Sequence, residues 1–350
     1  MTMLRVLVIS VGLLAGGCKK QGQADQATTP AATSPAIDSL LEAVPGDALA
    51  LAFVDMATPP WDVVTGGVGL VLDPETRKTL DTELRAYVDR YVGVDVSRLQ
   101  YAVGFVAGPP PSGAVLLKTV GGTPRFPGAI DVEGAKLWVV EPRDGISLAM
   151  KGDTVVVGKD DAVRSALATL AGKRKSVVVE NAPLVAFLHA ETKGAAVGIA
   201  ALVPKGVPLP PQLAGLQRVA VALGRTQVRA VVDGDDAMIT RLSGLVDQAI
   251  ATQLAQLQAA HDQAIAGTIP PPQGAFAIIG AAYAKSYAAK LRPRREGNRL
   301  AAALDLGPPG QEAMMGVAVV GMLAAIAVPA FIDYTAKAKK AEIAAPPEAD

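Results

Sequence analysis

The chain of 350 residues has few of the residue types from which most metal and redox sites are built. It contains one cysteine and two histidines, and only 4% of its residues are aromatic. A single cysteine excludes a disulfide within the chain. Neither His189 nor His261 has a second histidine or a cysteine at the spacing of a metal site, so each is interpreted as an ordinary polar side chain. The sequence therefore predicts no metal and no cofactor.

An excess of charge is also missing. The chain has 33 basic and 33 acidic residues. Because nucleic acids and anionic surfaces are bound by clustered Lys and Arg, this balance argues against nucleic acid as a partner. No GxSxG turn, phosphate-binding glycine loop or HExxH helix occurs. The sequence therefore gives no catalytic residue, and a hydrolase with an unrecognised site stays an alternative.

Long apolar runs are absent from most of the chain, but one lies near its C-terminal end. Residues 313–332 carry no charge. A helix needs roughly 20 apolar residues to cross about 30 Å of hydrocarbon, so a transmembrane helix is predicted within residues 308–340. A short disordered tail, residues 341–350, follows. Packing of the run into the domain as a buried helix is the alternative.

The same run carries a recognisable motif. Residues 323–329 read LAAIAVP and follow Gly321. The segment resembles the N-terminal hydrophobic helix of type IV pilins and type II secretion pseudopilins, which carry LAAIAIP after a mid-helix glycine. In that register Glu312 takes the place of the family's acidic residue and Gly307 that of the glycine before the processing site. Residues 308–311, PPGQ, depart from the family's pattern at that site.

The resemblance covers about 25 of the 350 residues and implies membrane insertion and helix packing. It implies that Glu312 compensates a positive group on a neighbouring pilin-like subunit, and that Gly307 is a possible processing point. A carboxylate that caps the helix N-terminus in the headgroup region is the alternative for Glu312, because the helix dipole favours negative charge there.

The N-terminus carries a targeting signal. Arg5 precedes a short apolar run, and small residues lead to the single cysteine, Cys18. This pattern resembles a bacterial lipoprotein signal peptide, residues 1–17, and the resemblance implies lipidation of Cys18. Residues 18–36 hold little that could be buried, so they are predicted to be a disordered tether.

The remaining residues are predicted to form an α+β domain with antiparallel meander sheets and helices on one face. Apolar and β-branched runs bounded by Gly and Pro predict the strands, and apolar spacings of three and four predict the helices. A proline-rich loop suggests two halves, 37–205 and 206–306. The expected strands are 48–56, 100–107, 113–120, 136–141, 154–158, 195–203, 217–223, 227–232 and 298–306, and the expected helices are 74–92, 160–170 and 235–265.

One short pattern suggests an internal repeat. The residues that end the strand at 154–158 and open the following helix share Asp-Asp-Ala with those at 235–237. Two explanations are open for this shared pattern: duplication of a strand-helix unit, or chance.

Together these features predict a doubly anchored, non-enzymatic cell-envelope lipoprotein that acts through protein contacts, beside a type IV pilus or type II secretion assembly. Its predicted partners are the membrane and pilin-like or secretion-system subunits. The extracytoplasmic domain requires the C-terminal helix to run inward and leave Lys337, Lys339 and Lys340 in the cytoplasm, as the positive-inside rule prefers. Four arginines upstream of the helix favour the opposite orientation, so the charge evidence is divided: Arg292, Arg294, Arg295 and Arg299. The simplest arrangement has both anchors in the inner membrane. A ligand-binding envelope domain with a plain C-terminal anchor is the alternative.

Overall fold

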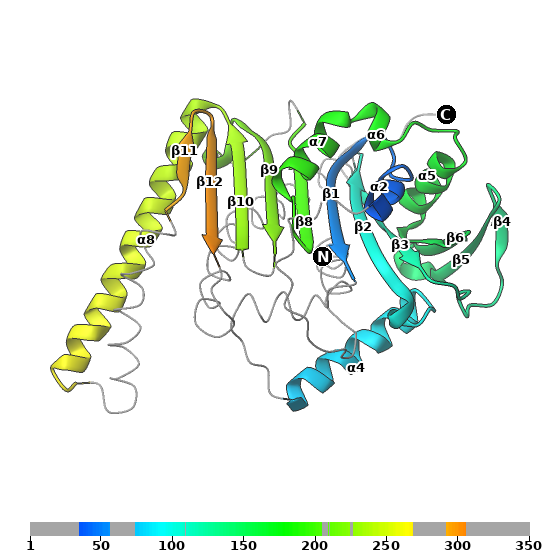
Figure 1. The fold of residues 1–350 in the computed structure, drawn as a ribbon, viewed down its shortest axis with the longest axis horizontal. Coiled ribbons are helices and arrows are strands. Elements are labelled where there is room, and N and C mark those ends of the chain that lie inside the picture. Colours follow the sequence, from blue (N-terminus) through cyan, green and yellow to red (C-terminus); the bar gives the residue numbers. More distant parts are fainter. Residues whose placement is uncertain are drawn as a thin grey trace, which may run out of the picture.

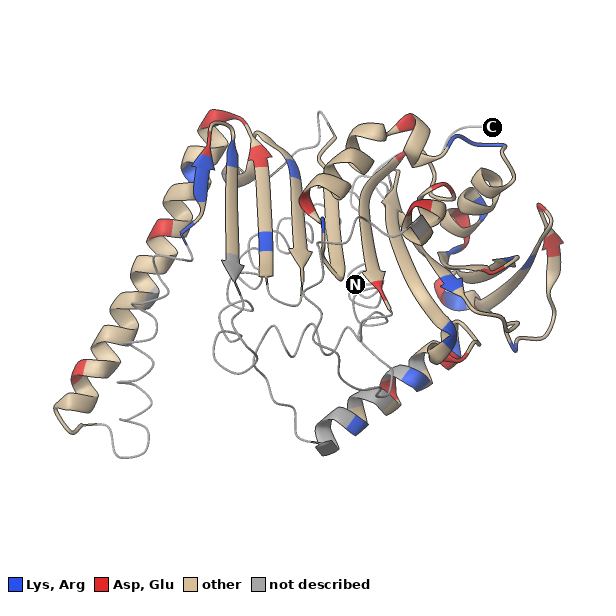
Figure 2. Ribbon diagram, in the orientation of Figure 1, with Lys and Arg blue, Asp and Glu red and all other residues tan. Residues whose placement is uncertain are grey.

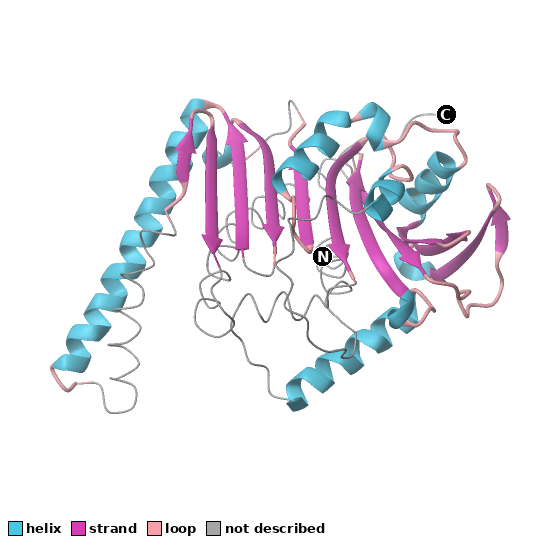
Figure 3. Cartoon of the chain, in the orientation of Figure 1, coloured by secondary structure: helices cyan, strands magenta, loops and turns pink. Residues whose placement is uncertain are grey.

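A computed structural model describes residues 35–56, 74–108, 110–204, 209, 211–224, 227–268 and 292–305. Their strands form one sheet (Figures 1 and 3). The strands are β1 (Ala48–Asp55), β2 (Leu99–Ala107), β3 (Ser112–Thr119), β4 (Ile130–Val132), β5 (Ala135–Glu141), β6 (Ile146–Lys151), β7 (Thr154–Lys159), β8 (Val197–Leu202), β9 (Leu216–Leu223), β10 (Gln227–Gly234), β11 (Arg294–Glu296) and β12 (Arg299–Asp305). The helices are α2 (Pro35–Leu41), α4 (Pro74–Tyr91), α5 (Asp160–Leu170), α6 (Val177–Glu180), α7 (Ala182–Glu191) and α8 (Asp236–Ile265), with 3₁₀ turns η1 (Val96–Arg98), η2 (Pro142–Asp144) and η3 (Pro211–Leu213).

The described strands follow the order β11-β12-β10-β9-β8-β1-β2-β3-β7-β6-β5-β4. Every neighbouring pair is antiparallel. This confirms the predicted α+β class with an antiparallel sheet. The predicted boundary at residue 205 falls between β8 and β9, which are hydrogen-bonded neighbours. One continuous sheet therefore spans the two predicted halves.

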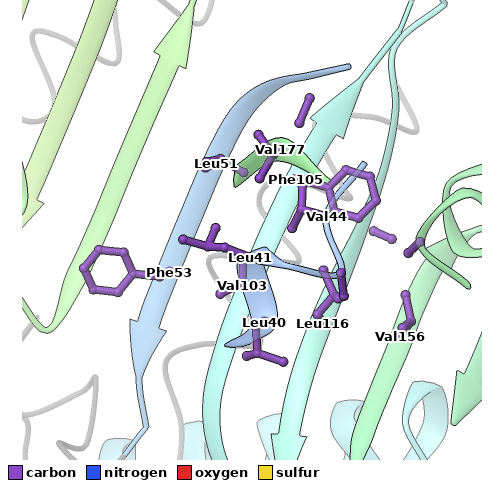
Figure 4. Close-up of a cluster of buried hydrophobic side chains, with 14 of the residues drawn as sticks. Leu40, Leu41, Val44, Leu51, Phe53, Val103, Phe105, Leu116, Val156 and Val177 are labelled. Atoms are coloured by element: carbon purple, nitrogen blue, oxygen red, sulfur yellow. The ribbon is translucent and has the colours of Figure 1, made fainter. Parts of the chain in front are cut away.

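One face of the sheet, called the α7 face here, carries α2, α5, α6 and α7. Alternate side chains of the central strands point into this layer, among them Phe53, Val103 and Leu116 (Figure 4). Leu40 and Leu41 of α2 and Leu188 of α7 cover them and are almost fully buried. Because successive strand residues point to opposite faces, the intervening residues build a separate core.

The opposite face carries α4 and α8. Val88 and Val92, at the end of α4, pack with Val115 and Trp138. At the other end of the sheet, Met238, Ile239 and Leu242 of α8 pack with Val232 and Leu300. The prediction that the helices lie on one face is therefore wrong. Alternation within a strand identifies its two faces, but it does not show which face a given helix will cover.

The two strand-helix units that suggested a repeat are both present, as β7–α5 and β10–α8. However, α5 packs on the α7 face through Val163 and Leu167, whereas α8 packs on the other face. The two units therefore leave the sheet on opposite sides, which argues against a simple duplication.

Local sequence explains the main turns. The turn between β4 and β5 places Glu133 and Gly134 at φ 53° and 72°. Positive φ at both central residues is the geometry of a two-residue hairpin whose twist matches the strands. At the start of α8, Asp235 Oδ1 accepts a hydrogen bond from the Met238 N–H (2.7 Å) and so caps the helix.

Candidate functional site

The three site residues predicted from the sequence, Cys18, Gly307 and Glu312, lie outside the described residues, as does the predicted transmembrane segment. Within the described ranges, no helix combines the length and the apolar character needed to span a bilayer. The same ranges hold no group of three or more metal-ligating side chains. The geometry of a functional site must therefore come from other residues.

The other residues singled out in the sequence have structural contacts. His189 Nε2 lies 3.4 Å from Asp38 Oδ1, which links α7 to α2. Asp160 Oδ1 accepts a hydrogen bond from the Ser147 hydroxyl (2.7 Å) on β6. The Arg164 guanidinium, which also bonds this carboxylate, is the main cause that lowers the pKa of Asp160, and the Ser147 bond adds to it. The aspartate at the start of α5 therefore fixes the helix to the sheet.

The most conspicuous polar arrangement is a row of alternating charges on the α7 face, called the ion-pair chain here. Its members lie on β9, β10, β12 and α7 (Figure 2 shows the charged positions on these strands). In order they are Arg218, Asp233, Arg299, Glu191 and Arg229. Three guanidinium groups therefore enclose two carboxylates.

Strand pairing puts three of these residues in one row. Asp233 of β10 lies opposite Arg218 of β9 and opposite Arg299 of β12. Side chains directly opposite in antiparallel strands lie close on the same face, so opposite charges attract across each ladder. Glu191 reaches the row from the last residue of α7. The cluster thus joins the layer of helices to the outer strands.

Arg299 is the centre of the chain. Its Nε and Nη2 donate to the two oxygens of Asp233 (2.8 and 3.0 Å), and its Nη1 donates to Glu191 Oε1 (2.8 Å). The hydrogen bond with Asp233 is the largest cause that raises the pKa of Arg299, and the charge of Glu191 adds to it. Because an arginine with a raised pKa stays protonated through the physiological range, Arg299 keeps its positive charge there.

The two ends of the chain each carry a further arginine. Arg218 Nε donates to Asp233 Oδ2, and its guanidinium stacks on the Phe187 ring with a 4.5 Å distance to the centroid. Arg229 Nη2 lies 2.9 Å from Glu191 Oε2. That oxygen is buried and accepts no hydrogen bond, so its contact with Arg229 is one of charge attraction alone.

The carboxylates of the ion-pair chain are more deeply buried than the arginines at its two ends. The Glu191 and Asp233 side chains are 5% and 10% exposed, whereas those of Arg218 and Arg229 are 40% and 39% exposed. Buried carboxylates are costly unless they are paired and hydrogen-bonded, and each of these has two guanidinium partners. The arrangement positions α7 against β10 and β12.

One signal for this site is present in the sequence. Arg218, Asp233 and Arg299 interrupt apolar strands at positions that alternation assigns to a core-facing side. Charges at such positions indicate buried pairs, but the partner of each charge depends on the strand order.

Three of the arginines upstream of the apolar C-terminal run are bound to the domain. Arg299 is held in the ion-pair chain. Arg295 donates to Thr240 Oγ1 (2.9 Å) and pairs with Asp236, both in the first turns of α8. Arg292 Nε lies 3.7 Å from Asp247 Oδ1, about two turns beyond Thr240.

Comparison with known proteins identifies no family. No family and no curated protein matches the sequence. Among solved structures, crystal forms I, III and IV of the Treponema protein TP0453 are similar, with TM-scores of 0.36, 0.35 and 0.34 and identities of 9%, 10% and 9%. These matches cover 81%, 79% and 80% of this chain and 96%, 97% and 95% of the other. Similarity at this level carries no functional argument.

Proposed function

We propose that this chain is a bacterial cell-envelope lipoprotein with two membrane attachments and a non-enzymatic, accessory role through protein contacts. A lipid on Cys18 is the first attachment and a helix within residues 308–340 is the second. The domain between them is extracytoplasmic. Its proposed partners are subunits of a type IV pilus or a type II secretion assembly, because the helix resembles those of pilins and pseudopilins.

The observation that carries the proposed orientation is the pairing of the upstream arginines. Topology is governed by Lys and Arg close to the ends of a membrane helix. Arg299, Arg295 and Arg292 each form an ion pair with a carboxylate of the folded domain. Long domains are translocated largely regardless of their charge, so arginines that belong to the folded domain weigh less than the lysines downstream of the helix. This supports a helix that runs inward and leaves residues 337–340 in the cytoplasm.

The lengths of the two links support attachment of the domain to a single membrane, for which the inner membrane is the simplest choice. Residues 19–34 separate Cys18 from α2, whose Ile37 is already buried. A flexible chain of this length has an end-to-end distance of about 20–24 Å. Residues 306–312 separate β12 from the apolar run, and their full extension is about 23–25 Å. Both links therefore keep the domain close to its attachments.

A fusion experiment tests the orientation. A protein that fluoresces only when it folds in the cytoplasm is joined after Asp350, and an enzyme active only outside the cytoplasm is joined there in a parallel strain. Fluorescence without enzyme activity is expected. Activity of the external enzyme would contradict the proposed orientation. Release of the chain from membranes by alkaline carbonate would contradict the proposed membrane helix.

Mass spectrometry of the mature chain tests both processing steps. A diacyl or triacyl modification at Cys18 and a chain that ends at Asp350 are expected. An unmodified Cys18 would contradict lipidation. A terminus created after Gly307 would show that the departures at residues 308–311 do not prevent processing there.

Substitution of Glu312 distinguishes a helix that takes part in assembly from a helix that is only a membrane anchor. In Glu312→Gln the charge that would compensate a neighbouring subunit is lost, so co-purification with pilin-like partners should fall. Glu342→Gln in the tail is the matched control and should leave co-purification unchanged. If Glu312→Gln behaves like this control, Glu312 is a helix cap, and the resemblance to pilins no longer supports assembly with pilin-like subunits.

A further inference from the structure

The far half of α8 has one side that is covered and one that is open. Ile250 is 5% exposed, and Leu254, Leu257, His261 and Ala264 are half-buried. These five residues, called the α8 seam here, recur alternately at four and three residues, which is the spacing of a helix-helix contact. Residues between them, such as Gln256 and Gln263, are exposed. A single partner that lies along the seam explains this pattern.

A buried oxygen supports the same conclusion. Gln258 Oε1, next to the seam, is inaccessible to solvent and has no hydrogen-bond partner. Figure 1 shows the lower half of α8 running clear of the other described strands and helices. An oxygen on the surface of a free-standing helix would be solvated, so its burial marks this side of α8 as a contact surface.

The course of the chain identifies the covering segment. The chain leaves α8 at Thr268, whose N–H donates to the Gln263 carbonyl, and it is next described at Arg292, beside Asp247. The segment between them must therefore span the distance from the last residue of α8, Ile265, back to the turn at Asp247. Those 18 helical steps span about 27 Å. Residues 274–291, after the prolines at 270–272, would cover about 27 Å as a helix of the same rise.

The sequence of this returning segment has the matching pattern. Its aromatic and β-branched residues Phe276, Ile279, Tyr283 and Tyr287 recur at three and four residues, which predicts one apolar helix face. Counting outward from the Asp247–Arg292 ion pair brings Leu257 within one residue of Tyr283, and Ala264 within one residue of Phe276.

We infer that the α8 seam is the docking surface for residues 274–291 of the same chain, which pair with it antiparallel. The pair forms an arm fixed at its base by the contacts of Arg292 and Arg295. The exposed side of α8, which includes Ala255, Gln256 and Gln263, is then the surface that the arm leaves for other proteins. This inference does not depend on lipidation or on the C-terminal helix.

Paired cysteines test the contact in the full-length chain. A disulfide requires Cβ atoms about 3.5–4.5 Å apart. On mild oxidation, Leu257→Cys with Tyr283→Cys should form a bond within one chain, identified by mass spectrometry of the linked peptides. The control pair, Ala259→Cys with Tyr283→Cys, places one cysteine on the exposed side of α8. The test pair should react about tenfold faster or more, because contact raises the effective concentration of the thiols.

Each other outcome overturns the inference. A bond between chains, seen as a covalent dimer, would make a second copy the occupant of the seam. No bond, or equal rates for the two pairs, would remove the contact. Hydrogen exchange on the unaltered chain covers the case in which the variants fail to fold: amides of residues 276–290 should be protected as well as those of residues 250–264. Rapid exchange confined to residues 276–290 would also refute it.

Discussion

Removal of the Arg299 guanidinium should loosen the outer strands of the sheet. Arg299→Ala deletes three hydrogen bonds to Asp233 and Glu191. Breaking a fully buried ion pair typically costs about 3–5 kcal/mol. Here each carboxylate keeps a second partner, Arg218 or Arg229, and Arg299 itself is 26% exposed. The expected loss is therefore smaller, about 2–3 kcal/mol of unfolding free energy.

The strand that carries Arg299 has little else to hold it. Leu300 is its only side chain that joins a described hydrophobic cluster, and the three residues after Leu300 are alanines. Because alanine side chains bury little area, β12 depends on its ladder with β10 and on the ion-pair chain. The effect of Arg299→Ala should therefore be concentrated in β12 and β11.

Urea denaturation measures the global loss, and hydrogen exchange of residues 294–305 measures the local one. Arg295→Ala is the matched control, because Arg295 pairs with an exposed carboxylate, Asp236. Exposed pairs contribute about 0–1 kcal/mol, so the control should lose no more than that. Arg299→Lys should fall between, because an ammonium cannot bond both oxygens of Asp233 and also reach Glu191.

Two results would refute this reasoning. The first is a loss for Arg299→Ala below about 0.5 kcal/mol, the range of ordinary surface substitutions. The second is an equal loss for Arg299→Ala and Arg295→Ala. Either would mean that the ion-pair chain does not stabilise the outer strands beyond the backbone ladder.

Three further outcomes are expected. Gly158→Ala should destabilise by about 1–3 kcal/mol in thermal melts, because its Cβ would lie 2.5 Å from the Ala114 Cα, a backbone atom that cannot move alone. Gly244→Ala, with nothing within 4 Å on the exposed side of α8, should instead stabilise by about 0.5–1 kcal/mol; loss of stability there would contradict the open surface. Acid titration should show stability that is retained above the unfolded-state carboxyl pKa of about 4 and lost as the pH falls through the lower folded-state pKa of Asp160, and Asp160→Asn should flatten this slope.

The sequence predicts the regular elements of this fold well where a segment has one clear period. The helix expected at 160–170 is α5, and those expected at 74–92 and 235–265 differ from α4 and α8 by one residue. The helix α7 was missed because its apolar residues, including Leu184, Val185 and Phe187, are buried on several sides, which removes the amphipathic period. Strands β4 and β11 were missed because three residues are too short to show alternation, and the six-residue strand β6 was missed as well.

The ion-pair chain was beyond prediction for a different reason. Arg218 and Asp233 come together because β9 and β10 form a hairpin, which the sequence does suggest. Arg299 joins them because β12, rather than the short β11, pairs with β10, and Glu191 joins because α7 covers that face. Both contacts depend on the order of the strands in the sheet and on the face of the sheet that each helix covers. They involve residues 66 and 108 positions apart in the chain, and no local pattern encodes them.

The same choice of strand order connects the domain to its proposed membrane attachment. Because β12 pairs with β10 along its whole length while β11 covers only residues 299–301, the chain leaves the domain from a strand that is held mainly by β10. A link of seven residues, 306–312, which ends with Glu312, then leads to the apolar run. Any restraint that the membrane places on this run therefore reaches β12 first, and Arg299 passes it to α7 through Glu191 and to β10 through Asp233. An edge strand of alanines without this arginine would separate from the sheet more easily, since only one ladder would hold it.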